Sequence, residues 1–175
     1  MDTRNKESET GSCGCQDKEK SDAFETIAIR KTEAKCGLCE EYVESHRDRT
    51  YAIASCEGAC LRGEISRQAA NILCHELAPS LTVRICSGSA LTKDSGQRSL
   101  LRNAPQVLLL EGCPISCASR SLEAVVPAMS RQIFYTDSLA DFDADMFGID
   151  ELEPQKLRTI ARGVAEKILA EITKP

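Results

Sequence analysis

Four short, mainly apolar runs divide much of the chain at regular intervals. They cover residues 50–55, 81–85, 106–110 and 131–135. Between them, residues 63–77, 97–103 and 114–126 read as helices that end close to a proline. Strands that alternate with helices in this way predict a parallel sheet with right-handed crossovers. We therefore expect a three-layer α/β fold, similar to flavodoxin or a Rossmann domain, with the strand order 2-1-3-4.

The clearest helix follows the last of these runs. Pro154 suits its first turn, where a missing N–H group costs no hydrogen bond. The apolar residues that follow recur at helical spacing, namely Leu157, Ile160, Ala161, Val164, Ile168 and Ile172. The pattern predicts a long amphipathic helix that packs on the sheet.

The N-terminal part has a different composition. Residues 1–22 are charged and polar, and such a segment cannot offset the entropy lost on ordering, so we expect a mobile tail. Residues 23–49 mix apolar and charged side chains without a firm period, and we expect them to be partly helical. The chain therefore divides into a polar, cysteine-containing segment, residues 1–49, and an α/β domain, residues 50–175.

Composition limits the classes of function. The 175 residues are 42% apolar and carry a formal net charge of -5, with a pI near 5.2. An acidic chain is a poor match for a phosphate backbone, so nucleic acid is not an expected partner. No apolar run approaches the ~20 residues that span a bilayer, and residues 1–22 contain no secretory signal. We expect a cytoplasmic protein without a membrane partner, in which the ten cysteines are metal-binding or redox-active thiols.

Four cysteines are grouped around the ends of the predicted strands. Cys56, Cys86 and Cys113 closely follow three of them, and Cys117 comes four residues after Cys113. The carboxyl ends of parallel strands meet at one edge, where α/β proteins bind ligands. Pro114 suits a helix start, so we expect Cys113 and Cys117 on one face of a first helical turn, whose N–H groups stabilise thiolates. A single cysteine is more often a core residue, but four at one edge favour tetrahedral zinc.

The same residues carry a resemblance to a known family. The segment LEGCPISCASRSLE (residues 110–123), with CEGACLRGEISRQAA (56–70) and RICSGSA (84–90), resembles the DGC-domain family, regarded as zinc-binding and named for an Asp-Gly-Cys motif. The likeness covers about residues 51–172, and its most specific part is Gly-Cys-Pro-x-x-Cys-Ala at 112–118. The resemblance implies that Glu111 stands in place of the family's Asp. It also implies that the metal ligands are Cys56, Cys86, Cys113 and Cys117.

A competing motif uses the same first cysteine. Cys56 and Arg62 have the Cys-x5-Arg spacing of small protein tyrosine phosphatases and related arsenate reductases. A thiolate at a helix N-terminus with an arginine clamp suits phosphoryl chemistry. Those enzymes carry Ser or Thr after the arginine and an Asp-Pro general acid, whereas Gly63 follows here and the chain has no Asp-Pro pair. A thiol-dependent phosphatase or reductase is therefore one alternative function, and an iron–sulfur or metal-trafficking protein is another.

The other cysteines and the histidines have weaker signals. Cys60 could act as a fifth thiol or pair with Cys56 on oxidation, whereas Cys74 is expected in the core. Cys36 and Cys39 could form a redox pair. A second zinc could be held by Cys13, Cys15, Cys36 and Cys39. His46 and His75 are expected to face solvent.

Overall fold

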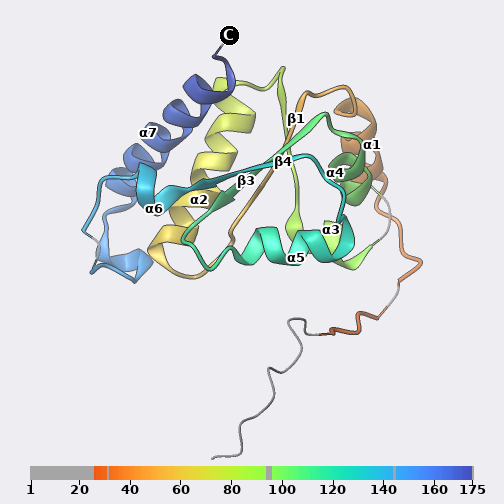
Figure 1. Cartoon of the computed structure of the whole chain (residues 1–175), viewed down its shortest axis with the longest axis horizontal. Helices are drawn as coiled ribbons and strands as arrows, with labels where there is room; N and C mark the ends of the chain where they lie inside the picture. Colours follow the sequence, from red (N-terminus) through yellow and green to blue (C-terminus); the bar gives the residue numbers. More distant parts are fainter. Residues whose placement is uncertain (1–25, 31, 94–95, 144, 175) are drawn as a thin grey trace, which may run out of the picture.

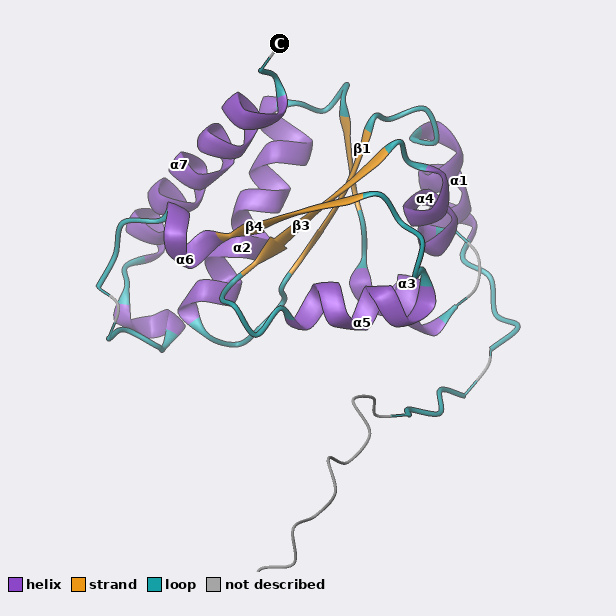
Figure 2. Cartoon of the chain, viewed as in Figure 1, coloured by secondary structure: helices purple, strands orange, loops and turns teal. Residues whose placement is uncertain are grey.

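A sheet of four parallel strands lies at the centre of the computed structural model, which describes residues 26–30, 32–93, 96–143 and 145–174 (Figures 1 and 2). The strands are β1 (Tyr51–Ser55), β2 (Thr82–Arg84), β3 (Gln106–Glu111) and β4 (Arg131–Tyr135). Their order, β2-β1-β3-β4, and their parallel pairing confirm the expected α/β fold. The expected N-terminal tail, with Cys13 and Cys15, lies outside the described residues.

Helices cover both faces of the sheet and complete three layers. One face carries α2 (Leu61–Ile72) and α7 (Pro154–Ile172), and the other carries α1 (Gly37–Ser45), α3 (Ser87–Thr92), α4 (Gln97–Asn103) and α5 (Cys117–Val125) (Figure 1). Alternate strand residues point to opposite faces, as the pleat requires. In β3, Leu108 and Leu110 pack in the core under α2 and α7, whereas Val107 and Leu109 pack in the core under α1, α3, α4 and α5.

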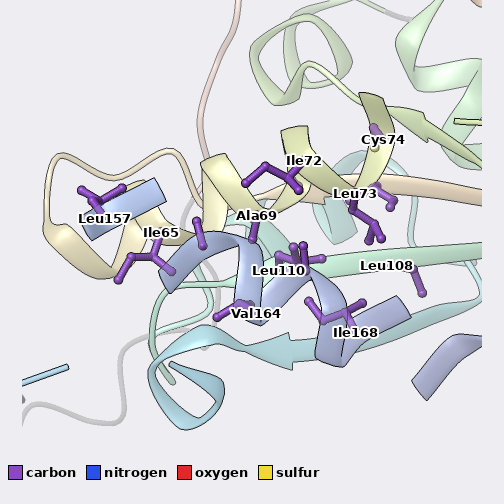
Figure 3. Packing of buried hydrophobic residues seen from close by; sticks show 14 of the residues in the cluster. Ile65, Ala69, Ile72, Leu73, Cys74, Leu108, Leu110, Leu157, Val164 and Ile168 are labelled. Carbon is purple, nitrogen blue, oxygen red and sulfur yellow. The ribbon is translucent and has the colours of Figure 1, made fainter. Parts of the chain in front are cut away.

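The core between the sheet, α2 and α7 is aliphatic. Figure 3 shows Ala69 of α2 and Val164 and Ile168 of α7 around Leu110 of β3. Each of these side chains is almost completely buried, and full burial of one Leu or Ile contributes about 1.5–3 kcal/mol. Cys74 lies in the same core at 4% exposure, as expected.

The predicted elements mostly match the observed ones. The 97–103 helix, the 131–135 strand and the final helix from Pro154 to Ile172 have the expected bounds. Helix α2 begins two residues before the predicted start, and a separate π-helix, η1 (Leu73–Leu77), follows its last residue. The short elements α3, α6 (Thr136–Leu139) and η2 (Ile149–Glu151) were not expected, because they are too short to show an apolar period. Within the described ranges, no helix combines the length and apolarity needed to cross a membrane.

The start of α5 differs from the prediction. Cys113 and Pro114 do not lie in a first helical turn, because α5 begins only at Cys117. Ser116, the residue before it, adopts the left-handed conformation, with φ 56° and ψ 49°. Its N–H group donates to the carbonyl of Cys113 at 3.1 Å, which closes a separate turn. Cys113 therefore lies in a turn between β3 and α5, whereas Cys117 is the first residue of the helix.

Candidate metal centre

The carboxyl ends of β1, β2 and β3 lie level with one another. The N–H group of Cys56 donates to the carbonyl of Leu110 at 2.8 Å, and that of Ile85 donates to the carbonyl of Ile53 at 2.8 Å. Cys56 directly follows β1, and Cys86 and Cys113 follow β2 and β3. The three cysteines therefore leave the sheet at one edge, as the parallel order predicts.

The sulfur of Cys56 is held between two loops. Backbone N–H groups of Gly58 and Gly112 donate to it. Burial raises the pKa of the Cys56 thiol, the two N–H groups act in the opposite direction, and electrostatic interactions with Glu111 and Cys117 raise it further. The sulfur is thus positioned as an acceptor, and Cys117 is close enough to affect it electrostatically.

Three glycines bring these loops into backbone contact. A Cβ on Gly112 would lie 2.9 Å from the nitrogen of Gly63 and 3.0 Å from the carbonyl carbon of Arg62. A Cβ on Gly63 would lie 2.9 Å from the Cα of Gly58. Neither position has room for a side chain, so the loops after β1 and β3 pack directly against the first turn of α2. We call this packing of Gly58, Gly63 and Gly112 the glycine contact. It explains why the residue after Arg62 is a glycine.

Glu111 caps the helix that begins with Cys117. Its carboxylate is fully buried and accepts hydrogen bonds from Ser119 N–H and Oγ, both at 2.5 Å, and from Ala118 N–H at 3.4 Å. A carboxylate at this end also interacts favourably with the helix dipole. Glu111, which stands where the DGC-domain motif has Asp, therefore has defined hydrogen-bond partners, all in the first turn of α5.

The four cysteines differ in exposure. Cys56 and Cys113 are partly exposed, and Cys86 and Cys117 are exposed; all four are free thiols. Among the described residues, no group of three or more His, Cys, Asp and Glu side chains has an arrangement that could hold a metal ion as it stands. The fold therefore brings the four residues to one edge of the sheet, but their side chains are not assembled into a metal-binding group.

An arginine on the edge strand fastens the loop after β1. The Arg84 guanidinium donates to Ser55 Oγ at 2.7 Å, to Asn71 Oδ1 at 3.0 Å and to the Glu57 carboxylate. Ser55 Oγ in turn donates to Glu57 at 2.9 Å. This network ties the residue after Cys56 to β2 and α2. Sequence reasoning missed it, because nothing in the sequence pairs Arg84 with a residue on another strand.

A groove of about 640 Å³ opens beside Cys86. Residues from α1, α2, η1, α3 and α4 and from the strand ends line it, including Cys39, Tyr42, Glu57, Arg67, Asn71, His75, Arg84, Cys86 and Gln97. The amide of Gln97 lies between two of its cysteines: it accepts from the N–H group of Cys86 at 3.2 Å and donates to the sulfur of Cys39 at 3.9 Å. Cys39 is thus positioned near Cys86, which the sequence did not indicate.

The phosphatase alternative finds little support in the geometry. The Arg62 guanidinium donates to the carbonyl of Met146 at 3.0 Å and lies over the Phe142 ring, 5.3 Å from its centroid. The first N–H group of α2, that of Leu61, donates to the carbonyl of Phe147 at 2.7 Å. Phe142, Met146 and Phe147 therefore engage two groups that a phosphatase loop would direct at its substrate.

The two histidines have different surroundings. His75 is exposed, as expected. His46 stacks on Tyr42 with ring centroids 4.2 Å apart, and its Nδ1 lies 2.7 Å from the carbonyl of Tyr42. His46 is therefore only partly exposed, because its ring packs against the last turns of α1.

Comparison with known families supports the sequence resemblance. The family model of the DGC domain matches residues 52–163, more than half of the chain. The match runs from β1 into α7 and contains Cys56, Cys86, Cys113 and Cys117. Comparisons with curated proteins and with solved structures gave no match.

Proposed function

The chain belongs to the DGC-domain family, and we propose that it is a cytoplasmic protein that binds one zinc ion through Cys56, Cys86, Cys113 and Cys117. Family membership supports metal binding as a general role. Zinc is proposed because four thiolates suit its tetrahedral coordination at ~2.3 Å. The cytoplasm is proposed because free thiols persist in a reducing compartment.

The observation that carries the proposal is the position of Cys56. Its sulfur accepts N–H groups from the loops after β1 and β3, so one ligand is anchored against the loop that supplies Cys113. Cys117, at the first position of α5, lies within electrostatic reach of it. A bound cation would favour both thiolates and would reverse the effects that now raise the pKa of the Cys56 thiol.

The remaining ligands can turn toward Cys56 at low cost. Cys86 and Cys117 are exposed, and Cys113 lies in a turn, so new side-chain rotamers displace little packing. An unfavourable rotamer costs about 0.5–1.5 kcal/mol. Structural zinc contributes about 10–16 kcal/mol in small zinc-binding peptides, so binding would outweigh several such changes.

The charge of such a site needs to be offset. Four thiolates around Zn²⁺ carry a net charge of about -2, and the buried Glu111 carboxylate lies nearby. The N-terminal N–H groups of α5 supply positive potential there. Arg120, exposed on the same helix, is positioned to contribute once its side chain turns toward the site.

The test is elemental analysis of the full chain purified without oxygen, with single Ser substitutions at the four positions. We expect one zinc per chain and a colourless protein, and loss of zinc in each variant. Cys36→Ser is the matched control, because Cys36 is also exposed but lies at the start of α1. Zinc retained by all four variants would refute the ligand set, and a brown protein containing iron would favour an iron–sulfur cluster instead.

A further inference from the structure

A second thiol lies beside Cys56. The sulfurs of Cys56 and Cys60 both border the same small space above Gly58, because a Cβ at Gly58 would lie 3.4 Å from one and 3.7 Å from the other. Both residues are partly exposed free cysteines. The position is open only because residue 58 has no side chain.

We propose that Cys56 and Cys60 form a reversible disulfide across Gly58, and that this disulfide competes with metal for Cys56. The first part depends only on the loop between β1 and α2. The second part rests on the proposed zinc site.

The two sulfurs are constrained differently, which makes Cys60 the one that moves. Cys56 Sγ is anchored by the N–H groups of Gly58 and Gly112. Among the described residues, the hydrogen bonds of Cys60 involve its backbone: its carbonyl accepts from Glu64 N–H at 3.0 Å, and it forms an isolated bridge with Gly148. Rotation of the Cys60 side chain therefore breaks none of these contacts and brings its sulfur toward the ~2.05 Å of a disulfide.

The chemistry needs one two-electron oxidant, for which a peroxide suffices. The Cys60 thiolate attacks a peroxide oxygen, so that an S–O bond forms, the O–O bond breaks and hydroxide leaves. The Cys56 thiolate then attacks the Cys60 sulfur, the S–S bond forms, and the S–O bond breaks with loss of a second hydroxide. The two hydroxides take up the two protons that the thiols released when they ionised. Overall, two thiols are oxidised and hydrogen peroxide is reduced to two waters. A dithiol reductant reverses the change by thiol–disulfide exchange.

The consequence for the metal follows from ligand number. Once its sulfur is in a disulfide, Cys56 has no thiolate to donate, and three of the four proposed ligands remain. Oxidation would therefore release zinc, and reduction would restore the site.

The test treats the full chain with one equivalent of hydrogen peroxide, with and without prior chelation, and maps the product by mass spectrometry. The tryptic peptide 50–62 contains Cys56 and Cys60 and no other cysteine. We expect this peptide to become lighter by two hydrogens and to resist alkylation until it is reduced. Peptide 50–62 fully alkylated on both cysteines after oxidation would overturn the proposal.

Two variants test the geometry. Gly58→Ala places a methyl group in ordinary van der Waals contact with both sulfurs. The loop keeps its conformation, but the methyl group lies between the sulfurs, so disulfide formation should slow by roughly tenfold or more. Gly88→Ala is the control, because nothing lies within 4 Å of the position that its Cβ would take. An unchanged rate in Gly58→Ala would mean that the sulfurs meet by another route.

Zinc release, followed with a chromogenic chelator, tests the competition separately. We expect zinc to be released in step with the disulfide in the wild type, and to be retained at low peroxide in Cys60→Ser. Zinc retained by a protein that carries the Cys56–Cys60 disulfide would overturn the competition. A protein that forms the disulfide but holds no zinc beforehand would instead refute the proposed zinc site and leave the thiol pair established.

Discussion

The buried carboxylate of Glu111 accepts both hydrogen bonds that Ser119 can donate, from its backbone N–H group and from its hydroxyl, each at 2.5 Å. Glu111 is the last residue of β3, and Ser119 is in the first turn of α5. The pair therefore fixes where the helix starts relative to the strand, and with it the position of Cys117.

Removing this cap should weaken the whole domain. We expect Glu111→Ala to lower the free energy of unfolding by about 1–3 kcal/mol, since N–H groups of α5 and the Ser119 hydroxyl lose a buried acceptor. Urea denaturation measures the change. Ser121→Ala serves as the control, because this exposed hydroxyl donates to the carbonyl of Cys117 within its own helix, and its loss should cost less than ~0.5 kcal/mol. Equal stability of Glu111→Ala and the wild type would refute the capping role.

The glycine contact leads to a prediction with a matched pair. Gly112→Ala should destabilise the protein by several kcal/mol or prevent folding, because the new Cβ meets the backbone of Arg62 and Gly63 at 2.9–3.0 Å. Gly163→Ala should instead stabilise it by about 0.5–1 kcal/mol, since Gly163 lies within α7 with nothing within 4 Å of the added methyl. Thermal melts of the two variants provide the measurement. A tolerated Gly112→Ala would show that the loops after β1 and β3 have freedom to separate.

Ser116 combines backbone strain with hydrogen bonding. Its hydroxyl lies 3.0 Å from Tyr135 Oη and donates to the carbonyl of Pro114 at 3.2 Å, while its φ of 56° is unfavourable for a residue with a Cβ. Ser116→Gly loses the hydroxyl but relieves about 1 kcal/mol of strain, whereas Ser116→Ala loses the hydroxyl and keeps the strain. We therefore expect the Gly variant to be more stable than the Ala variant in chemical denaturation. The opposite order would mean that Ser116 is not left-handed in solution.

Cys74 should make stability depend on alkaline pH. Burial raises the pKa of its thiol from 9.0 to about 11. Because the folded pKa is the higher one, the protonated thiol contributes its full stabilisation below about pH 9, and this contribution is lost as the pH rises toward 11. The loss amounts to about 2–3 kcal/mol at most.

The measurement for Cys74 is the free energy of unfolding at about pH 8 and about pH 10.5 in the wild type and in Cys74→Ala. We expect the wild type to lose more stability between the two pH values than the variant does. Groups that do not interact with Cys74 titrate alike in both proteins and cancel in the comparison. Tyr42 does not cancel: burial raises its pKa and Cys74 raises it further, so its own titration is followed separately by its absorbance. Parallel pH profiles would contradict the assignment.

The strands and their order could be predicted because the signal is local: short apolar runs alternate with helical patterns, and connection rules then limit the topology. The start of α5 could not. Pro114 and the four-residue spacing of Cys113 and Cys117 are ordinary helix signals. The helix instead begins where the Glu111 carboxylate, at the end of β3, meets its N–H groups, and left-handed Ser116 lies between the two cysteines. The glycine contact was equally hidden, because each glycine taken alone resembles an ordinary turn residue.

The glycine contact also determines when, during folding, the cysteines at the carboxyl ends of the strands can come together. Gly63 and Gly112 are far apart in the sequence, and they meet only after β3 has inserted beside β1. In short zinc-binding motifs, the ligands are neighbours in the sequence, so metal can gather them early and direct folding. Here the non-local strand pairing, which carries the larger loop-closure entropy, has to come first. A chain still lacking β3 would have Cys56 and Cys60 but no partner loop, so metal capture at the proposed site would be a late step that follows assembly of the sheet.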